Sequence, residues 1–227
     1  TLDDKPLIEK ELIGSKIISE KRHSSINTVE LNLENGVKIY LKPTTNKINS
    51  FEFEAQSLGG YSHASLEDYH SAKSTEDLIN AWIGFGSFSR SEIRNKIDEE
   101  TNLKIWLSRF YEGLEGGAKT DKAEELFKLI YLRFAPLKID EVVFQNFISF
   151  LKEEKRNEKL NFKDEFNTKV FEELCKNHHR CKSTEFKDIS KIKIKSIKDF
   201  YDDRFADSSD FVFTFVGDFK IEDMKFY

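Results

Sequence analysis

The sequence lacks the patterns that would assign it to several common functional classes. Its 36 Lys and Arg residues are interleaved with 41 Asp and Glu residues and form no basic domain, so nucleic acid is not an expected partner. No apolar run reaches the roughly 18 residues that span a bilayer, and no membrane span is expected. There is no G-x-S-x-G motif, and the two cysteines lack a nucleophile signature, which leaves no identifiable hydrolytic triad.

What the sequence does contain is typical of a globular protein with a heavily solvated exterior. Hydrophobic residues make up 38% and charged residues 34% of 227 positions, and the formal net charge is −5. Residues 1–27 carry little pattern and are expected to be a linker or interdomain segment, whereas residues 28–227 form a single domain. The closing residues DFKIEDMKFY resemble the start of a helix, so we expect this domain to be truncated at its C-terminal helix.

Strand patterns dominate the first part of the domain. Apolar and polar residues alternate over 29–33 and again over 37–41, with Glu34-Asn35-Gly36 between them, which predicts a β-hairpin. A third strand alternates polar residues, which are Glu52, Glu54 and Gln56, with an apolar or small set, which is Phe51, Phe53, Ala55 and Ser57. This alternation predicts a half-buried strand at an edge of the sheet, with one wet face.

Helices and further strands follow. Helices are expected over 66–82, 89–100 and 123–134, and residues 103–119 are expected to form two strands or one long bent strand. After another helix near Phe147, a third helical pattern places Phe162, Phe166, Val170 and Leu174 on one buried face at four-residue steps. Residues 211–216 are apolar on both faces and predict a central strand. The order indicates an α+β fold, in which an antiparallel sheet of mixed strand order is backed by a layer of helices.

The two cysteines flank a histidine pair in CKNHHRC. One interpretation is a zinc or disulfide clip formed by Cys175 and Cys181 with His178 or His179. The favoured interpretation is that a helix simply ends here, because a structural zinc site usually spaces its cysteines more closely and places its histidines outside them. The cellular compartment does not follow from two cysteines.

Several phrases occur together in an order that resembles the pitrilysin/insulinase zinc metallopeptidases, the inverzincins. They are LENGVKIYLKPT, SLGGYS, DYHSA, GFGSFSRSEIRNKI, YEGLEGGAKTDKAEELFKLIYLRFAPLKIDEVVFQNF, KNHHR and FYDDRFADSSDFVFTFVGDF. No phrase is specific alone, but their order and spacing extend over residues 29–227. The similarity is to the third of four homologous domains in the long, two-halved bacterial members, which is a non-catalytic copy.

The resemblance implies a peptidase-like domain within an enzyme that closes two halves around a peptide like a clamshell. It implies that the zinc and the general base belong to the amino-terminal half, so zinc is expected in the full-length protein and no cofactor in this segment. It also implies that the partners are other domains of the same polypeptide and extended peptide substrates. Relatives of this type are usually exported, which implies a periplasmic or otherwise exported location.

The helix expected after the Gly-Gly turn corresponds, by the resemblance, to the helix that carries the metal site. In catalytic copies it carries H-x-x-E-H, whose two imidazoles bind zinc while the Glu activates water. Here the window contains His70 alone, followed by SAKST, and one imidazole cannot hold a catalytic zinc. His63 with Glu67 or Asp68 is a conceivable second group, and Glu153 or Glu154 lies near the position of the third zinc ligand, but solvated surface side chains are the favoured interpretation.

Three functional hypotheses follow. The first is a non-catalytic peptidase domain that helps to form the substrate chamber, for which the edge of the strand from Phe51 to Ser57 is a candidate site of peptide pairing. The second is a catalytically silent structural or assembly scaffold in a larger complex, which an exposed apolar patch would favour. The third, an independent hydrolase that uses other residues, has no supporting motif.

Overall fold

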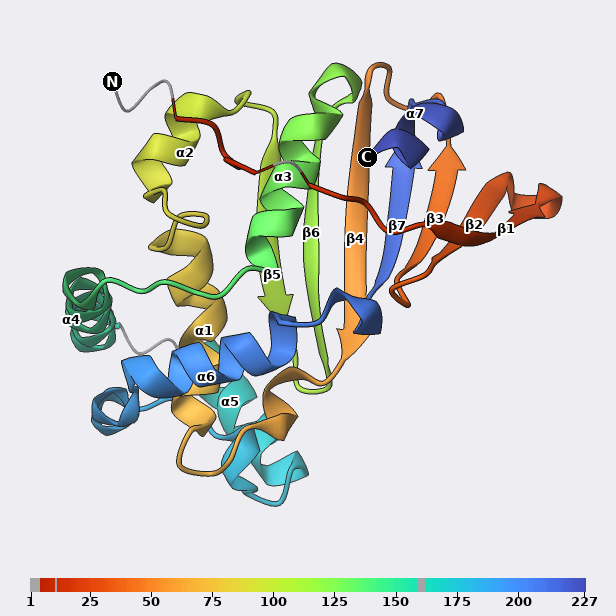
Figure 1. Cartoon of the computed structure of the whole chain (residues 1–227). Helices are drawn as coiled ribbons and strands as arrows, with labels where there is room; N and C mark the ends of the chain where they lie inside the picture. Colours follow the sequence, from red (N-terminus) through yellow and green to blue (C-terminus); the bar gives the residue numbers. More distant parts are fainter. Residues whose placement is uncertain (1–4, 11, 159–161) are drawn as a thin grey trace.

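The computed structural model describes residues 5–10, 12–158 and 162–227, and it contains one seven-stranded sheet backed by helices (Figure 1). The strands lie side by side in the order β1-β2-β3-β7-β4-β6-β5. Their bounds are β1 Ile17–His23, β2 Thr28–Leu33, β3 Lys38–Pro43, β4 Ser50–Leu58, β5 Asn102–Leu107, β6 Tyr111–Lys119 and β7 Val212–Gly217. All neighbours are antiparallel except β3 and β7, which are parallel. The predicted α+β class is confirmed.

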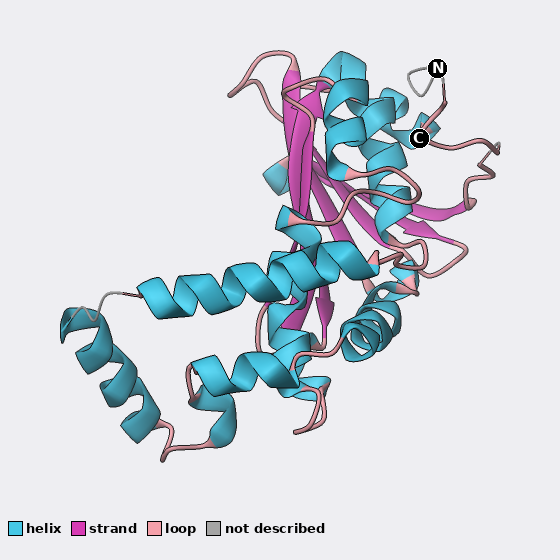
Figure 2. Cartoon of the chain, turned by 90° about the vertical axis from the view of Figure 1, so that its left-hand side faces the viewer, coloured by secondary structure: helices cyan, strands magenta, loops and turns pink. Residues whose placement is uncertain are grey.

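The helices lie on one face of the sheet and beyond one of its ends. Their bounds are α1 Tyr69–Ala81, α2 Arg90–Lys96, α3 Ala123–Arg133, α4 Glu141–Asn157, α5 Phe162–Leu174, α6 Ile194–Phe205 and α7 Ile221–Phe226. Figure 1 shows α3 and α7 in front of the strands and α1, α4, α5 and α6 toward the lower left. Within the described part of the chain, no α-helix covers the opposite face of the sheet (Figure 2). None of the described helices is long and apolar enough to cross a membrane.

The main hydrophobic core lies between the sheet and the helix layer. Phe215 of β7 stacks on Phe53 of β4 and on Phe127 of α3, with ring centroids 5.4 and 5.3 Å apart. Phe51, Leu41 and their neighbours on the same face are almost completely buried. Removing this apolar and aromatic surface from water is the main force that holds the helices against the strands.

Strand β7 is central, as its sequence predicts. It pairs with β3 on one side and with β4 on the other. Phe213 and Phe215 point into the core, while Val212 and Val216 point to the open face and remain 40% and 37% exposed. Residues 102–119 form the two strands β5 and β6, the first of the two expected alternatives.

The expectation that the strand from Phe51 to Ser57 is an edge strand is wrong. This segment belongs to β4, which pairs with β6 on one side and β7 on the other. Phe51, Phe53, Ala55 and Ser57 are 2%, 4%, 0% and 6% exposed and face the helix layer. Alternating hydrophobicity reports that one face of a strand is wet, but it does not report how many neighbours the strand has.

The two edges of the sheet are β1 and β5. Strand β1 lies within residues 1–27, where the sequence predicts a linker, and it pairs with β2 along its length. Its sequence, IISEKRH, is short and highly charged, and its side chains are mostly exposed. An edge strand of this kind buries too little apolar surface to leave a clear alternating pattern.

The predicted burial of one face of α5 is also wrong. The helix forms at the expected position, but Phe162, Phe166 and Leu174 are 89%, 67% and 79% exposed. Val170 is 41% exposed. The helix follows the outer end of α4 and lies at the periphery of the molecule (Figure 2), where its Phe171 ring lies 4.7 Å from the Arg109 guanidinium. The four-residue period therefore predicts the helix correctly, while the surface that would cover its apolar face is absent from the described residues.

Candidate functional site

Helix α1 is the place where a zinc motif would lie, and it presents a different set of side chains. H-x-x-E-H needs its residues at positions i, i+3 and i+4 on one face of a helix. Counted from His70, this spacing in α1 gives Lys73 and Ser74, and one further turn along the helix the set is Lys73, Glu76 and Asp77. A lysine ammonium has no lone pair to offer a metal. The sequence indicates His70 as a candidate and does not single out Lys73, Glu76 and Asp77, although their K-x-x-E-D spacing places them on one face of the helix.

The ionisation of these three groups is perturbed by their surroundings. Desolvation lowers the pKa of the Lys73 ammonium, and the positive charges of Lys155 and Arg109 act in the same direction. Desolvation raises the pKa of Asp77. It also raises the pKa of Glu76, although a hydrogen bond from the Leu107 amide opposes the shift. The positive charges near Lys73 would repel a divalent cation.

The same face of α1 closes the outer edge of β5. The Asn80 side chain accepts a hydrogen bond from the Ile105 amide at 3.0 Å and donates one to the Ile105 carbonyl at 2.8 Å. The Glu76 carboxylate accepts a hydrogen bond from the Leu107 amide at 2.7 Å. These are the outward-facing backbone groups that an added strand would use. Pairing of an extended peptide along this edge would therefore require α1 to release them.

His70 contacts a carboxylate of a different element. Its Nε2 atom lies 3.6 Å from Asp188, and its buried Nδ1 atom has no hydrogen-bond partner among the described residues. Desolvation lowers the pKa of the imidazole, while the charge of Asp188 acts in the opposite direction. The Asp188 carboxylate is also bonded to Lys191 at 2.7 Å. His70 is thus a packed side chain that holds α1 beside the segment 186–191.

The other candidate metal ligands lie apart from His70. His63 is exposed at the end of the Gly-Gly turn and is close enough to Glu112 of β6 to influence its pKa. Glu153 is an exposed residue of α4. Among the described residues, no group of three His, Cys, Asp or Glu side chains could hold a metal ion. The described residues of this site therefore do not fit zinc.

The Gly-Gly turn is built around a buried carboxylate. Glu112 is 1% exposed, accepts a hydrogen bond from the Gly60 amide and lies 3.6 Å from the Arg204 guanidinium of α6. Gly60 has a φ of +65°, and a Cβ atom there would clash with the Ser108 carbonyl. Burial raises the pKa of Glu112, although the Gly60 amide and Arg204 both oppose the shift. Glu112 thereby fixes the entrance to α1.

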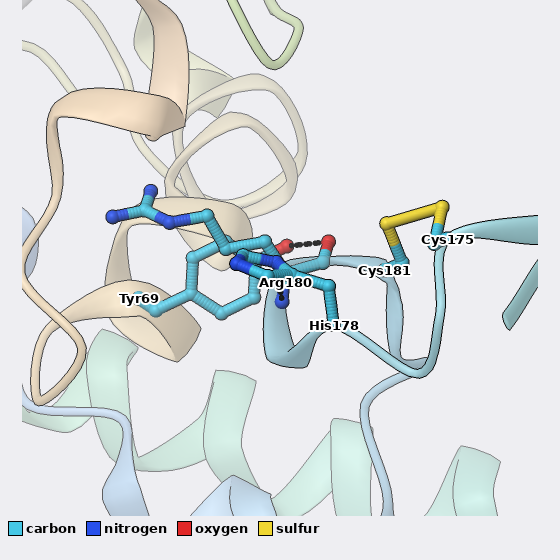
Figure 3. The surroundings of a disulfide bond; sticks show 5 residues. All are labelled: Tyr69, Cys175, His178, Arg180 and Cys181. Atoms are coloured by element: carbon cyan, nitrogen blue, oxygen red, sulfur yellow. Dashed lines mark hydrogen bonds between the residues drawn. A yellow bond between two sulfur atoms is a disulfide. The ribbon is translucent and has the colours of Figure 1, made fainter.

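Cys175 and Cys181 form a disulfide, which corrects the favoured interpretation of this segment (Figure 3). Helix α5 does end at Leu174, as expected, but the loop that follows is cross-linked, with the two Cα atoms 6.3 Å apart. The alternative of a disulfide clip is therefore confirmed. Between the cysteines, His178 accepts a hydrogen bond from the Arg180 amide at 3.3 Å.

Arg180 connects the cross-linked loop to the entrance of α1. Its guanidinium donates hydrogen bonds to the carbonyls of Tyr61 at 2.9 Å and Ala64 at 2.7 Å. It also lies 5.6 Å from the centroid of the Tyr69 ring, whose hydroxyl donates to the Arg180 carbonyl at 2.6 Å (Figure 3). The disulfide loop and the start of α1 are thus one hydrogen-bonded unit.

Comparison with known proteins places the fold. No protein-family model matches the sequence, and no curated protein matches it either. Among solved structures, the chain is similar to the periplasmic protease PqqL from Escherichia coli, with a TM-score of 0.75 and 18% identity over 98% of this chain and 24% of that one. It is also similar to the ferredoxin protease FusC, solved as a mutant in complex with Arabidopsis ferredoxin, with a TM-score of 0.74 and 17% identity over 97% of this chain and 25% of that one.

A third similar structure is the inactive domain of a peptidase of family M16, the pitrilysin/insulinase peptidases, from Pseudomonas fluorescens. The TM-score is 0.71 and the identity 14%, over 88% of this chain and 48% of that one. The chain therefore has the fold of an M16 peptidase domain, of the kind seen in an inactive copy, and the resemblance read from the sequence is confirmed at the level of the fold. It spans about a quarter of the length of PqqL and of FusC.

Proposed function

We propose that this chain is a non-catalytic domain of a zinc metalloendopeptidase of the pitrilysin/insulinase type. In this proposal it helps to form the peptide-substrate chamber of a clamshell enzyme, and the zinc site lies in another part of the polypeptide. The observation that supports the proposal is that α1 contains no H-x-x-E-H and has His70 as its single histidine, in a domain with the M16 peptidase fold. The partners are then the other domains of the same chain and extended peptides.

The disulfide supports the exported location that the resemblance implies. Disulfides persist in oxidising compartments and are rare in reducing ones, and both cysteines of the chain are paired. The similar protease PqqL is periplasmic. We therefore propose that the domain works outside the cytoplasm.

The first test concerns the parent polypeptide. The proposal requires that the gene encoding this chain also encodes H-x-x-E-H in another domain, and that the intact parent protein cleaves an unstructured peptide in a reaction stopped by chelator. Deleting the present domain from the parent should abolish cleavage while the zinc content remains. A parent sequence without any H-x-x-E-H motif would contradict the proposal.

The second test concerns the chain itself. Purified without a nickel column, it should contain far less than one zinc per molecule by mass spectrometry and should cleave no peptide. Stoichiometric zinc that is lost after substitution of His70 or Glu76 would show that α1 binds a metal. The proposal that the zinc site lies in another part of the polypeptide would then be wrong.

An alternative function is a catalytically silent scaffold in a larger assembly. The observation that favours it is the exposed apolar face of α5, where Phe162, Phe166 and Leu174 are 89%, 67% and 79% exposed, because such patches often mark stable interfaces. This alternative is distinguished by the parent gene, which would then encode only copies without a zinc motif. Replacing Phe166 with lysine would release the domain from the assembly without unfolding it.

A further inference from the structure

The open face of the sheet carries a hollow of about 550 Å³. It extends across β5, β6, β4 and β7, and its lining includes Glu52 and Glu54 of β4, Glu115 of β6 and Val216 of β7. Strand register shows how these side chains meet, because Glu52 pairs with Gly117 and Val216, while Glu54 pairs with Glu115 and Thr214. Because Gly117 has no side chain, the hollow is deeper at the position beside Glu52.

The centre of this hollow is negatively charged. Of the three glutamates that line it, only Glu115 has a basic partner, Lys104 of β5, at 2.6 Å. Within the described part of the chain, Glu52 and Glu54 form no ion pair, and both are exposed. On the other side of Glu52, the same row of the sheet reaches Lys42 of β3, two strands away in register, which corresponds to about 10 Å.

Two carboxylates in the hollow face each other across neighbouring strands. Glu54 and Glu115 lie directly opposite each other on neighbouring antiparallel strands. Like charges in that position destabilise a strand pair. Lys104 offsets the charge of Glu115, and Glu54 is left as the carboxylate that a second cation could pair with.

The surface around these carboxylates is apolar and extended. Val212 and Val216 are 40% and 37% exposed on the same face, and Thr214 lies between them. A free metal ion would gain nothing from the valines, whereas an extended polypeptide can place a cationic side chain on the glutamates and its apolar neighbours on β7. Charge complementarity of this kind also raises the association rate.

We propose that the open face binds an extended polypeptide segment that carries lysine or arginine, with the cationic side chain between Glu52 and Glu54 and the adjoining residues on Val212 and Val216. This inference rests on the proposed function in one respect, since in the chamber of a peptidase that segment would be the substrate. The preferred substrates would then be locally basic.

The direct test is a binding measurement on the 227-residue chain. The probe is a fluorescein-labelled, strand-length peptide of alternating lysine and threonine, and the matched probe has glutamate in place of lysine. Fluorescence polarisation should detect the basic peptide and not the acidic one. In the double variant Glu52→Gln/Glu54→Gln, affinity for the basic peptide should fall about five- to tenfold, as expected for two exposed charge contacts. Added salt should weaken the wild-type complex.

The control variant is Glu153→Gln/Glu154→Gln in α4, which removes the same charge from exposed residues that do not line the hollow. It should bind as the wild type does, and circular dichroism should show both variants to be folded. Equal losses in the two variants would reduce the effect to net charge and overturn the proposal. So would displacement of the peptide by Mg²⁺ beyond that caused by NaCl of equal ionic strength, because the glutamates would then form a metal site.

Cleavage by the parent protein separates this inference from the proposed function. If the parent cleaves peptides and the Glu52→Gln/Glu54→Gln variant loses its preference for basic over acidic substrates, both proposals stand. An unchanged preference would overturn the inference alone. If the parent has no peptidase activity but the isolated chain binds the basic peptide through these glutamates, the proposed function fails and the binding surface stands.

Discussion

Arg180 joins two parts of the molecule that are distant in sequence. Its guanidinium binds the Tyr61 and Ala64 carbonyls, lies near the Tyr69 ring and projects from the disulfide loop. The two donor groups of one planar fork reach both carbonyls at once, a geometry that a lysine ammonium cannot reproduce. A single side chain therefore orients the entrance to α1.

Replacing Arg180 should be costly. Arg180→Ala is expected to lower the free energy of unfolding by about 2 kcal/mol, because two charge-assisted hydrogen bonds are lost, and Arg180→Lys should recover less than half of that. Urea denaturation followed by circular dichroism measures both changes. The control is Arg156→Ala, which removes an exposed arginine near the Phe186 ring and should cost less than about 1 kcal/mol. Equal costs for the two alanine variants would mean that the Arg180 hydrogen bonds contribute no net stability.

Glu112 should make stability depend on pH in the opposite sense to a carboxylate whose pKa is lowered on folding. Burial raises its pKa in the folded chain above the ordinary value of 4.5. Between these two values the folded state binds more protons than the unfolded state, so the contribution of this group to stability increases as the pH falls from above the folded pKa toward about 4.5. At higher pH the contribution is lost.

The variant Glu112→Gln isolates this effect, because it cannot ionise. The free energy of unfolding of the wild type should therefore improve relative to that of Glu112→Gln as the pH is lowered from neutrality toward about 4.5, measured by urea denaturation at several pH values. The prediction concerns the direction in which this difference in the free energy of unfolding changes with pH. A difference that is constant, or that shifts toward the variant at low pH, would place the folded pKa of Glu112 at or below its unfolded value.

At the scale of elements, helices α4 and α5 differ sharply in what they bury. Phe147 of α4 is 1% exposed and packs edge-on against Trp82, with ring centroids 6.1 Å apart. Phe166 of α5 is 67% exposed. Phe147→Ala should cost about 3–5 kcal/mol because it leaves a cavity in the core, whereas Phe166→Ala should change the free energy of unfolding by less than about 0.5 kcal/mol.

Thermal or urea denaturation of the two variants compares the same substitution in neighbouring helices. A large loss for Phe166→Ala in the isolated chain would show that the apolar face of α5 is covered, for instance by self-association, which dilution would then reverse. A small loss in the isolated chain and a large loss of binding in a complex would instead support the scaffold alternative.

These elements also show which parts of the fold the sequence determines. The segment 211–216 is apolar on both faces, and a strand of that kind needs neighbours on both sides, so the central place of β7 is predictable. In β4, alternation fixes which face is wet but leaves the number of neighbours open, and the strand proves to be internal. The periodicity of α5 predicts a helix, but periodicity cannot supply the partner surface.

The candidate site was less predictable than the fold. The loss of H-x-x-E-H is visible from His70 and its neighbours, yet the roles of Glu76 and Asn80 are not, because their hydrogen bonds reach a strand about thirty residues away in the sequence. The same holds for Arg180, which acts on carbonyls more than one hundred residues earlier. Local patterns report periodicity and motif spacing, whereas these contacts depend on how distant elements pack.

At the scale of the whole molecule, the two edges of the sheet differ in whether a helix covers them. Strand β1 leaves its outer edge uncovered by any described α-helix, and exposed charged residues blunt it. The outer edge of β5 is closed by α1, where Asn80 satisfies both backbone groups of Ile105 and Glu76 satisfies the Leu107 amide. A domain that holds an edge in this way is protected from adding strands of other chains.

Removing the Asn80 side chain should therefore change both stability and association. Asn80→Ala leaves the Ile105 amide and carbonyl without partners, which should lower the free energy of unfolding by about 2 kcal/mol and make light scattering increase with protein concentration as open β5 edges pair. Asn80→Asp keeps the acceptor and loses the donor, so it should lie between the wild type and Asn80→Ala in both measurements. Asn95→Ala on α2, an exposed position, should resemble the wild type. If Asn80→Ala is as stable and as monomeric as that control, α1 does not seal the edge, and a peptide substrate could pair with β5 without any movement of the helix.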